Sequence, residues 1–116
     1  MNGAILAALA AFVAVLVMTR LLAARARVSG EAARALVQAG AALIDVRTPG
    51  EFSMGHLPGA RNLPLGELSR RMTELSKDQP VVVYCASGAR SAMARRSLIR
   101  AGFDAHDLGP QRAWPG

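Results

Sequence analysis

Apolar and charged positions divide the chain into two parts of different character. No charged residue occurs from Asn2 to Thr19, and the stretch from Ala4 to Met18 is entirely apolar. At about 1.5 Å per residue, a helix of about 18 residues spans roughly 27 Å, close to the thickness of the bilayer hydrocarbon core. Because the segment has no polar face, it predicts a helix that crosses a membrane rather than one that lies on its surface.

After this leader, short apolar runs alternate with helical patterns. The runs rich in aliphatic residues predict strands, and apolar residues at helical spacing predict helices between them. Strands are expected at 42–46, 60–63, 81–84 and 103–108, and helical segments at 29–40, 49–52, 65–75 and 91–101. The alternation predicts an α/β domain over 28–116, with an open, mostly parallel central sheet flanked by helices. It is preceded by one N-terminal transmembrane helix and a basic juxtamembrane segment over 1–27.

Composition and charge exclude several classes of function. The formal charge is +6, but Arg20, Arg25 and Arg27 contribute half of it, and the remainder has 11 bases against 8 acids. Aromatic residues make up only 4% of the chain, so neither a basic stripe nor stacking aromatics indicates nucleic-acid binding. One cysteine excludes an intramolecular disulfide, and with two scattered histidines it excludes a Cys/His zinc cluster.

Basic residues on the C-terminal side of the leader predict its orientation. Arg20, Arg25, Arg27 and Arg34 favour a body held in the cytoplasm by the positive-inside rule, with residues 2–24 in contact with lipid. The expected location is therefore the inner, cytoplasmic membrane, as a single-pass protein. The alternative is a signal sequence: 24–26 has the small-x-small form of a cleavage site, and cleavage would send the body to the periplasm. A signal usually has a basic n-region, which this leader lacks.

Candidate chemistry gathers at the end of the strongest predicted strand. Cys85 follows the 81–84 run directly, and in open α/β sheets ligands bind beyond the carboxyl ends of the strands. Small residues and a glycine then allow successive backbone N–H groups to face one anion. The helix that follows and Arg90 add positive charge, and all three effects favour a thiolate over a thiol. A lone buried cysteine can be a small hydrophobe, but this strand–Cys–tight loop–Arg–helix order favours nucleophilic chemistry.

These segments together resemble the single-domain rhodanese family of sulfurtransferases. The resemblance covers about 28–114 and rests on three segments in the family's order. They are Leu43-Ile44-Asp45-Val46-Arg47 with Glu51-Phe52 and 55–64, then Cys85-Ala86-Ser87-Gly88-Ala89-Arg90-Ser91, then Leu108-Gly109 with Ala113-Trp114. Six residues from Cys85 to Arg90 match the sulfurtransferases, whereas the related phosphatases and arsenate reductases have one residue more.

The resemblance implies a ping-pong sulfurtransferase. Cys85 would take sulfane sulfur from thiosulfate or a low-molecular-weight persulfide as a persulfide, and pass it to a thiophilic acceptor: cyanide, a thiol or an acceptor protein. The substrate would bind in the loop, at Ala86, Ser87, Gly88, Ala89, Arg90 and Ser91, without a metal or organic cofactor. With no second cysteine, turnover requires an external acceptor. The alternative is a membrane-tethered binding, regulatory or sulfur-carrier module with little small-molecule turnover.

Other polar residues near these motifs are expected to be structural. An ion pair between Arg47 and Glu51 is predicted from their spacing, and a structural hydrogen bond is predicted for His56. The sequence also departs from the family at Gly109-Pro110-Gln111-Arg112, where a glycine-rich run is usual, and the family's final helix is expected to be short or missing.

Overall fold

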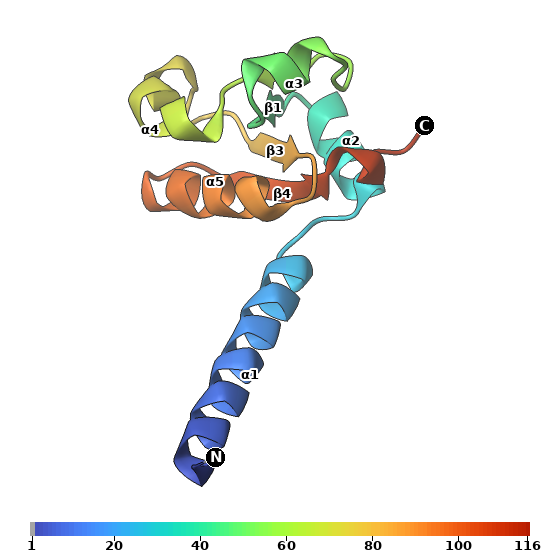
Figure 1. Cartoon of the computed structure of the whole chain (residues 1–116). Helices are drawn as coiled ribbons and strands as arrows, with labels where there is room; N and C mark the ends of the chain where they lie inside the picture. Colours follow the sequence, from blue (N-terminus) through green and yellow to red (C-terminus); the bar gives the residue numbers. More distant parts are fainter. Residues whose placement is uncertain (1) are drawn as a thin grey trace.

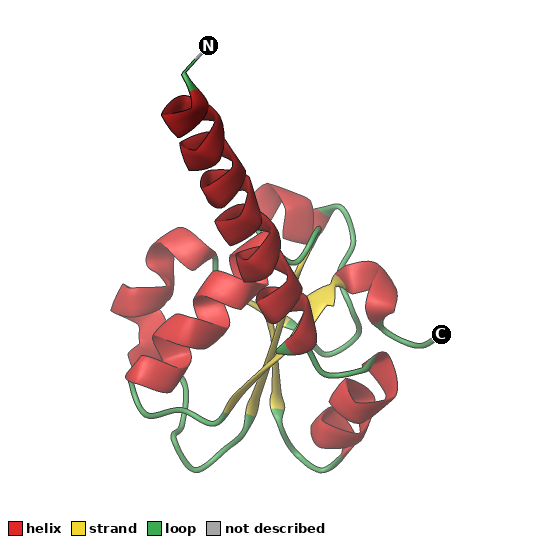
Figure 2. Cartoon of the chain, turned by 90° about the horizontal axis from the view of Figure 1, so that it is seen from below, coloured by secondary structure: helices red, strands yellow, loops and turns green. Residues whose placement is uncertain are grey.

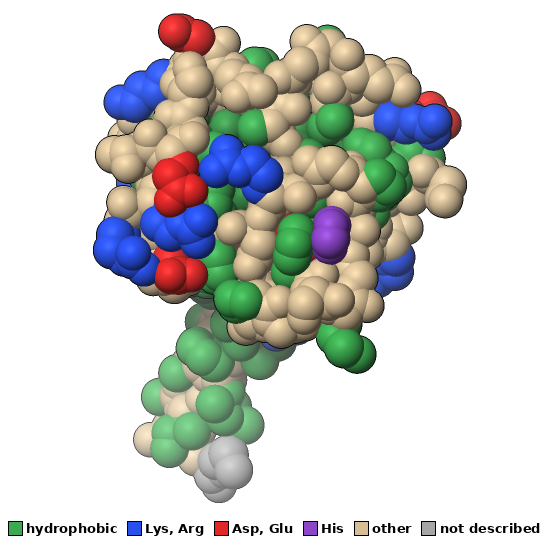
Figure 3. Space-filling model, turned by 90° about the horizontal axis from the view of Figure 1, so that it is seen from above, with side chains coloured by type: hydrophobic (Ala, Val, Ile, Leu, Met, Phe, Trp, Pro, Cys, Tyr) green, Lys and Arg blue, Asp and Glu red, His purple; other side chains and the backbone are tan. Residues whose placement is uncertain are grey.

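A long N-terminal helix projects from a small α/β body in the computed structural model, which describes residues 2–116 (Figure 1). Residue 1, the first position of the predicted leader, lies outside the described residues. Helix α1 (Gly3–Arg25) has exposed side chains throughout 3–22, and that stretch has a mean hydropathy of 2.5. Figure 3 shows hydrophobic side chains covering the projecting helix. By length and composition, this helix is able to cross a membrane.

Four parallel strands form the centre of the body, in the order β2-β1-β3-β4. Their bounds are β1 (Ala42–Asp45), β2 (Arg61–Asn62), β3 (Val81–Cys85) and β4 (Ala105–Pro110). The predicted open parallel α/β sheet is confirmed. Strand β3 is fully buried because it lies between β1 and β4 and is covered on both faces, which explains its unbroken run of apolar residues.

Helices cover both faces of the sheet (Figure 2). On one face, α2 (Gly30–Gln38) places Ala33 against side chains of β1, β3 and β4. Its start is the one expected, because the Ser29 hydroxyl accepts a hydrogen bond from the Ala32 N–H at 3.1 Å. On the other face, α5 (Ala89–Arg100) buries Ala94 and Leu98 against a second apolar cluster.

The segment 65–75 differs from the single helix that its apolar spacing predicts. It forms η1 (Leu65–Glu67), α4 (Leu68–Arg71) and η2 (Met72–Glu74), a succession of 3₁₀ and α turns. None of the three has a side-chain cap, and Gly66 lowers helix propensity at the start. The apolar positions still serve the core, since Leu68 and Leu75 are buried. Close to the C-terminal end of the described residues, η3 (Gln111–Ala113) forms a single 3₁₀ turn.

Candidate active site

Cys85 is the last residue of β3 and lies at the carboxyl edge of the sheet, as its position in the sequence predicts. Its side chain has no exposed surface. The five residues of β3 are all buried, so the cysteine is held at the end of a strand that is buried along its whole length.

Two backbone N–H groups of this loop donate to the Cys85 sulfur. The Gly88 N–H lies 3.0 Å from Sγ and the Ser91 N–H lies 3.4 Å from it. Gly88 has a φ of +102°, a conformation that L side chains rarely adopt, and it forms the N-cap of α5. The turn of the backbone at Gly88 thus directs N–H donors and the positive end of α5 toward one sulfur atom.

The loop residues differ in exposure. Ala86, Ser87 and Ala89 face solvent, whereas Gly88 and Ser91 are buried. The Ser91 hydroxyl lies 3.5 Å from the Cys85 sulfur and donates to the Gly88 carbonyl at 3.2 Å. Ser91 therefore connects the two ends of the loop beneath its exposed rim.

Arg90 is turned toward a carboxylate rather than toward the sulfur. Its guanidinium makes a bidentate pair with Glu51 of α3 (Pro49–Ser53), at 2.6 and 3.0 Å. The hydrogen bond to Glu51 is the main cause that raises the Arg90 pKa, against the effect of burial, and the charge of Glu51 raises it further. The same pair lowers the pKa of Glu51 to about 2, with help from the Thr48 backbone. Much of the positive charge that the sequence assigned to the loop is therefore neutralised.

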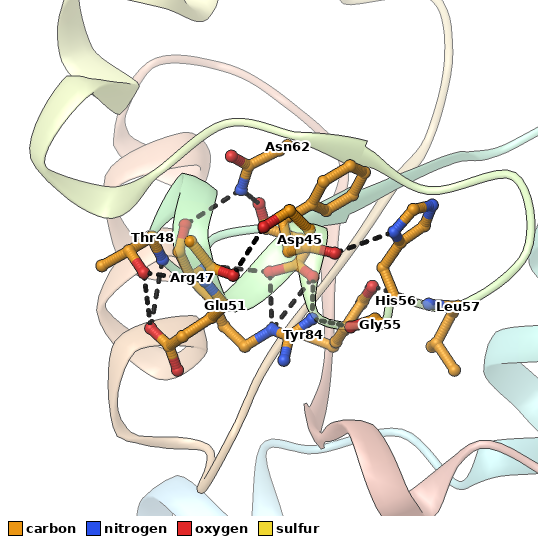
Figure 4. A network of polar contacts seen from close by, with 12 residues as sticks. Asp45, Arg47, Thr48, Glu51, Gly55, His56, Leu57, Asn62 and Tyr84 are labelled. Atoms are coloured by element: carbon orange, nitrogen blue, oxygen red, sulfur yellow. Dashed lines mark hydrogen bonds and ion pairs between the residues drawn. The ribbon is translucent and has the colours of Figure 1, made fainter.

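The predicted ion pair between Arg47 and Glu51 is wrong. Arg47 instead pairs with the fully buried Asp45, with its Nη2 2.7 Å from Oδ2 and its Nε 3.0 Å from both carboxylate oxygens (Figure 4). The same Nη2 donates to the Gly55 carbonyl at 2.7 Å, which fixes the end of the α3 turn. The hydrogen bond to Asp45 raises the Arg47 pKa, against the effect of burial. The prediction relied on the helical spacing of Arg47 and Glu51. In the structure the Glu51 carboxylate pairs instead with Arg90, 39 residues away in sequence.

His56 has the structural role that was expected. Its Nδ1 lies 3.0 Å from the Phe52 carbonyl oxygen, and its ring stacks on the Phe52 ring with centroids 3.7 Å apart (Figure 4). Nearby, the buried Tyr84 hydroxyl accepts a hydrogen bond from the Leu57 N–H at 3.0 Å. Burial raises the Tyr84 pKa, so the phenol stays protonated. These contacts hold the loop after α3 against the sheet.

Two residues beside the site were not identified from the sequence. Asp107 of β4 is buried, its carboxylate accepts the Gly109 N–H at 2.7 Å, and burial raises its pKa against the effect of hydrogen bonds from Ser91 and Gly109. No distinctive signal in the sequence marks Asp107, because the predicted strand 103–108 also contains Asp104 and His106. Arg27 was assigned to the juxtamembrane segment, but its guanidinium packs against both Gly88 and Gly109. No local pattern in the sequence indicates that contact.

A buried cysteine at a sheet's carboxyl edge, with N–H donors turned onto its sulfur, defines a cysteine site built on an anion-binding loop. The family model for rhodanese-like domains matches residues 29–109, and the chain belongs to this family. The buried Cys85 occupies the position expected of the family's active-site cysteine.

Individual relatives agree with this assignment. The chain is 48% identical over 62 residues to an uncharacterised protein of Bacillus subtilis, and 46% identical over 61 residues to a sulfurtransferase of Allochromatium vinosum. Each match covers 53% of this chain, and 49% and 57% of the respective relatives, so the chain spans about half the length of these proteins. Among solved structures, it is similar to the human single-domain sulfurtransferase, with 28% identity, a TM-score of 0.66, and coverage of 77% of this chain and 94% of the human one.

Proposed function

We propose that this protein is a sulfurtransferase that carries sulfane sulfur on Cys85. The observation that supports this most directly is the pair of N–H donors, from Gly88 and Ser91, on a buried cysteine sulfur at the start of α5. Such donors stabilise negative charge on Sγ, which is the charge of both the attacking thiolate and the persulfide. The six-residue spacing from Cys85 to Arg90 favours a loop sized for one added sulfur atom rather than for a phosphate group.

With thiosulfate as donor, the reaction has two steps. The Cys85 thiolate attacks the outer sulfur, a new S–S bond forms, and the bond to the sulfonate sulfur breaks with its electron pair leaving on sulfite. The persulfide then gives its outer sulfur to cyanide or to a thiolate, and the Cys85 thiolate is regenerated. No metal or organic cofactor takes part in either step, and a low-molecular-weight persulfide replaces thiosulfate by the same attack.

Intact-mass measurement of the full chain in neutral detergent tests this proposal. After incubation with thiosulfate or glutathione persulfide, we expect a mass gain of one sulfur atom that is lost when cyanide is added. The Cys85→Ser variant, which keeps the size of the side chain, should show no gain. A folded protein that gains no sulfur from either donor would contradict the proposal and favour a binding module. Loading followed by very slow release to small acceptors would identify a carrier that serves one partner protein.

We further propose that 1–27 anchors the body, 28–116, to the cytoplasmic face of the inner membrane. The exposed apolar surface of 3–22 and the arginines that follow it support this arrangement. A reporter fused after Gly116 tests the orientation. A reporter that is active only in the cytoplasm should work, and activity of a periplasm-only reporter would contradict the proposed side. Loss of the leader from the mature protein would favour the signal-sequence alternative.

A further inference from the structure

One cation beside the sulfur-binding loop, Arg27, comes from the segment before the domain and forms no ion pair among the described residues. Arg47 and Arg90 are both paired with carboxylates, of Asp45 and Glu51. The Arg27 guanidinium has no carboxylate within 4 Å among the described residues 2–116, and its Nε is buried without a hydrogen-bond partner there. The charge of the buried Asp107 acts on Arg27 from nearby, but the Nε of Arg27 is desolvated without an acceptor, which favours the binding of an anion.

Contacts of Arg27 place this charge against the loop that surrounds the Cys85 sulfur. Its Nη2 and Cζ occupy the space into which a side chain at Gly88 would project, and its Cδ and Nε fill the corresponding space at Gly109. Gly88 is the residue whose N–H donates to the Cys85 sulfur at 3.0 Å. Backbone pairing fixes the approach, because Arg27 forms a parallel bridge with Asp107 and the Val28 N–H donates to the Asp107 carbonyl at 2.8 Å.

Arg27 also lines an open, positively charged cleft. This cleft has a volume of about 570 Å³ and lies along the exposed side of the loop, between the C-terminal end of α1 and the first turns of α5. Arg20 and Arg96 contribute to its walls, and among the described residues no acidic side chain lines it. Loop residues 87–89 also line the cleft, so an anion bound there would contact the loop whose Gly88 N–H donates to the Cys85 sulfur.

We infer that Arg27 binds the oxyanion end of the sulfur donor and makes the site selective for a small dianion of the thiosulfate type. This inference rests on the proposed sulfurtransferase function. A guanidinium presents paired N–H donors that match the oxygens of a sulfonate, and the same contact stabilises the sulfite that departs. A persulfide has no sulfonate oxygens to accept the paired N–H donors of Arg27, so the two donor classes should depend on this residue differently.

Steady-state kinetics on the full chain in phosphatidylcholine nanodiscs, whose lipid carries no net charge, tests the inference. The donors are thiosulfate and 2-hydroxyethyl persulfide, which has no oxyanion. For Arg27→Ala we expect the KM for thiosulfate to rise at least fivefold and the KM for the persulfide to change less than twofold. Arg27→Lys keeps the positive charge but loses the paired N–H donors of the guanidinium. Its effect on the KM for thiosulfate should therefore be intermediate. Arg34→Ala, an exposed arginine of α2, is the matched control and should match the wild type.

The outcomes separate this inference from the function on which it rests. A wild-type chain that transfers sulfur from neither donor would defeat the sulfurtransferase proposal itself. An active wild type whose Arg27→Ala variant keeps its KM for thiosulfate would overturn the role of Arg27 alone. An equal loss with both donors would show that Arg27 only supports the loop structure, and would also overturn the inference.

Discussion

Replacing Asp45 by Asn should strongly destabilise the body, because it leaves the Arg47 guanidinium without its charge partner. Asp45 is fully buried and Arg47 is 9% exposed, so water replaces little of the lost interaction. The Asn side chain still accepts the Arg47 backbone N–H, a bond of 2.9 Å in the native protein, and the volume of the site is unchanged. The substitution therefore isolates the charge pair.

Removing one partner of a buried ion pair typically costs about 3–5 kcal/mol. Because one edge of the guanidinium reaches solvent and Nη2 keeps its bond to the Gly55 carbonyl, we expect the lower end, about 3 kcal/mol. For a domain of this size, that loss corresponds to a fall in Tm of roughly 12–24 °C.

Urea unfolding of the full chain in neutral detergent measures this cost, with the emission of Trp114 as the signal, since it is the single tryptophan of the chain. The double variant Asp45→Asn/Arg47→Gln removes the unpaired charge and should be more stable than Asp45→Asn alone. Glu74→Gln, which breaks exposed pairs with Arg61 and Arg71, is the matched control and should hardly move the midpoint. A loss below about 1 kcal/mol for Asp45→Asn would refute the reasoning, because a buried guanidinium left without its carboxylate should cost several times more.

Two further predictions concern the loop and its ion pair. Gly88→Ala should slow sulfur loading at least tenfold in the mass assay, because the φ of +102° disfavours alanine and the new methyl would collide with Arg27, whereas Gly66→Ala, with no atom near its Cβ position, should load normally. The pair between Glu51 and Arg90 should contribute stability fully above the ordinary Glu pKa of 4.5 and lose it as the pH falls toward about 2. In urea titrations, the free energies of unfolding of wild type and Glu51→Gln should therefore differ by a constant amount above about pH 5 and converge in acid. A difference in unfolding free energy that stays constant down to about pH 2 would contradict the assignment.

Local patterns were sufficient to predict the sheet and the position of the cysteine. The unbroken apolar run before Cys85 requires a central strand covered on both faces, and a strand of that kind places its last residue at the carboxyl edge. Ser29 was likewise predicted to cap a helix, and in the structure it is the N-cap of α2. These inferences succeed because they depend on residues close in sequence.

Partner choice among the charged residues was not predictable in the same way. Arg47 had two acids within reach along the chain, Asp45 and Glu51, and only the packing of α3 against the loop decides between them. Arg27 is far from Gly88 in sequence, and its contact depends on the parallel pairing of residue 27 with Asp107 of β4. Such pairings are set by tertiary geometry, so a single sequence cannot fix them.

The pairing of residues 27 and 28 with β4 also protects an edge of the sheet. In the described structure β2 is only two residues long, which leaves β4, with six, as the more extended edge strand. Unpaired edge strands are templates for pairing between molecules and for aggregation. The bridge from Arg27 to Asp107, and the hydrogen bond from the Val28 N–H, occupy the middle of that edge. A soluble form of the body should therefore retain both residues, because trimming beyond them would uncover a strand able to join one molecule to the next.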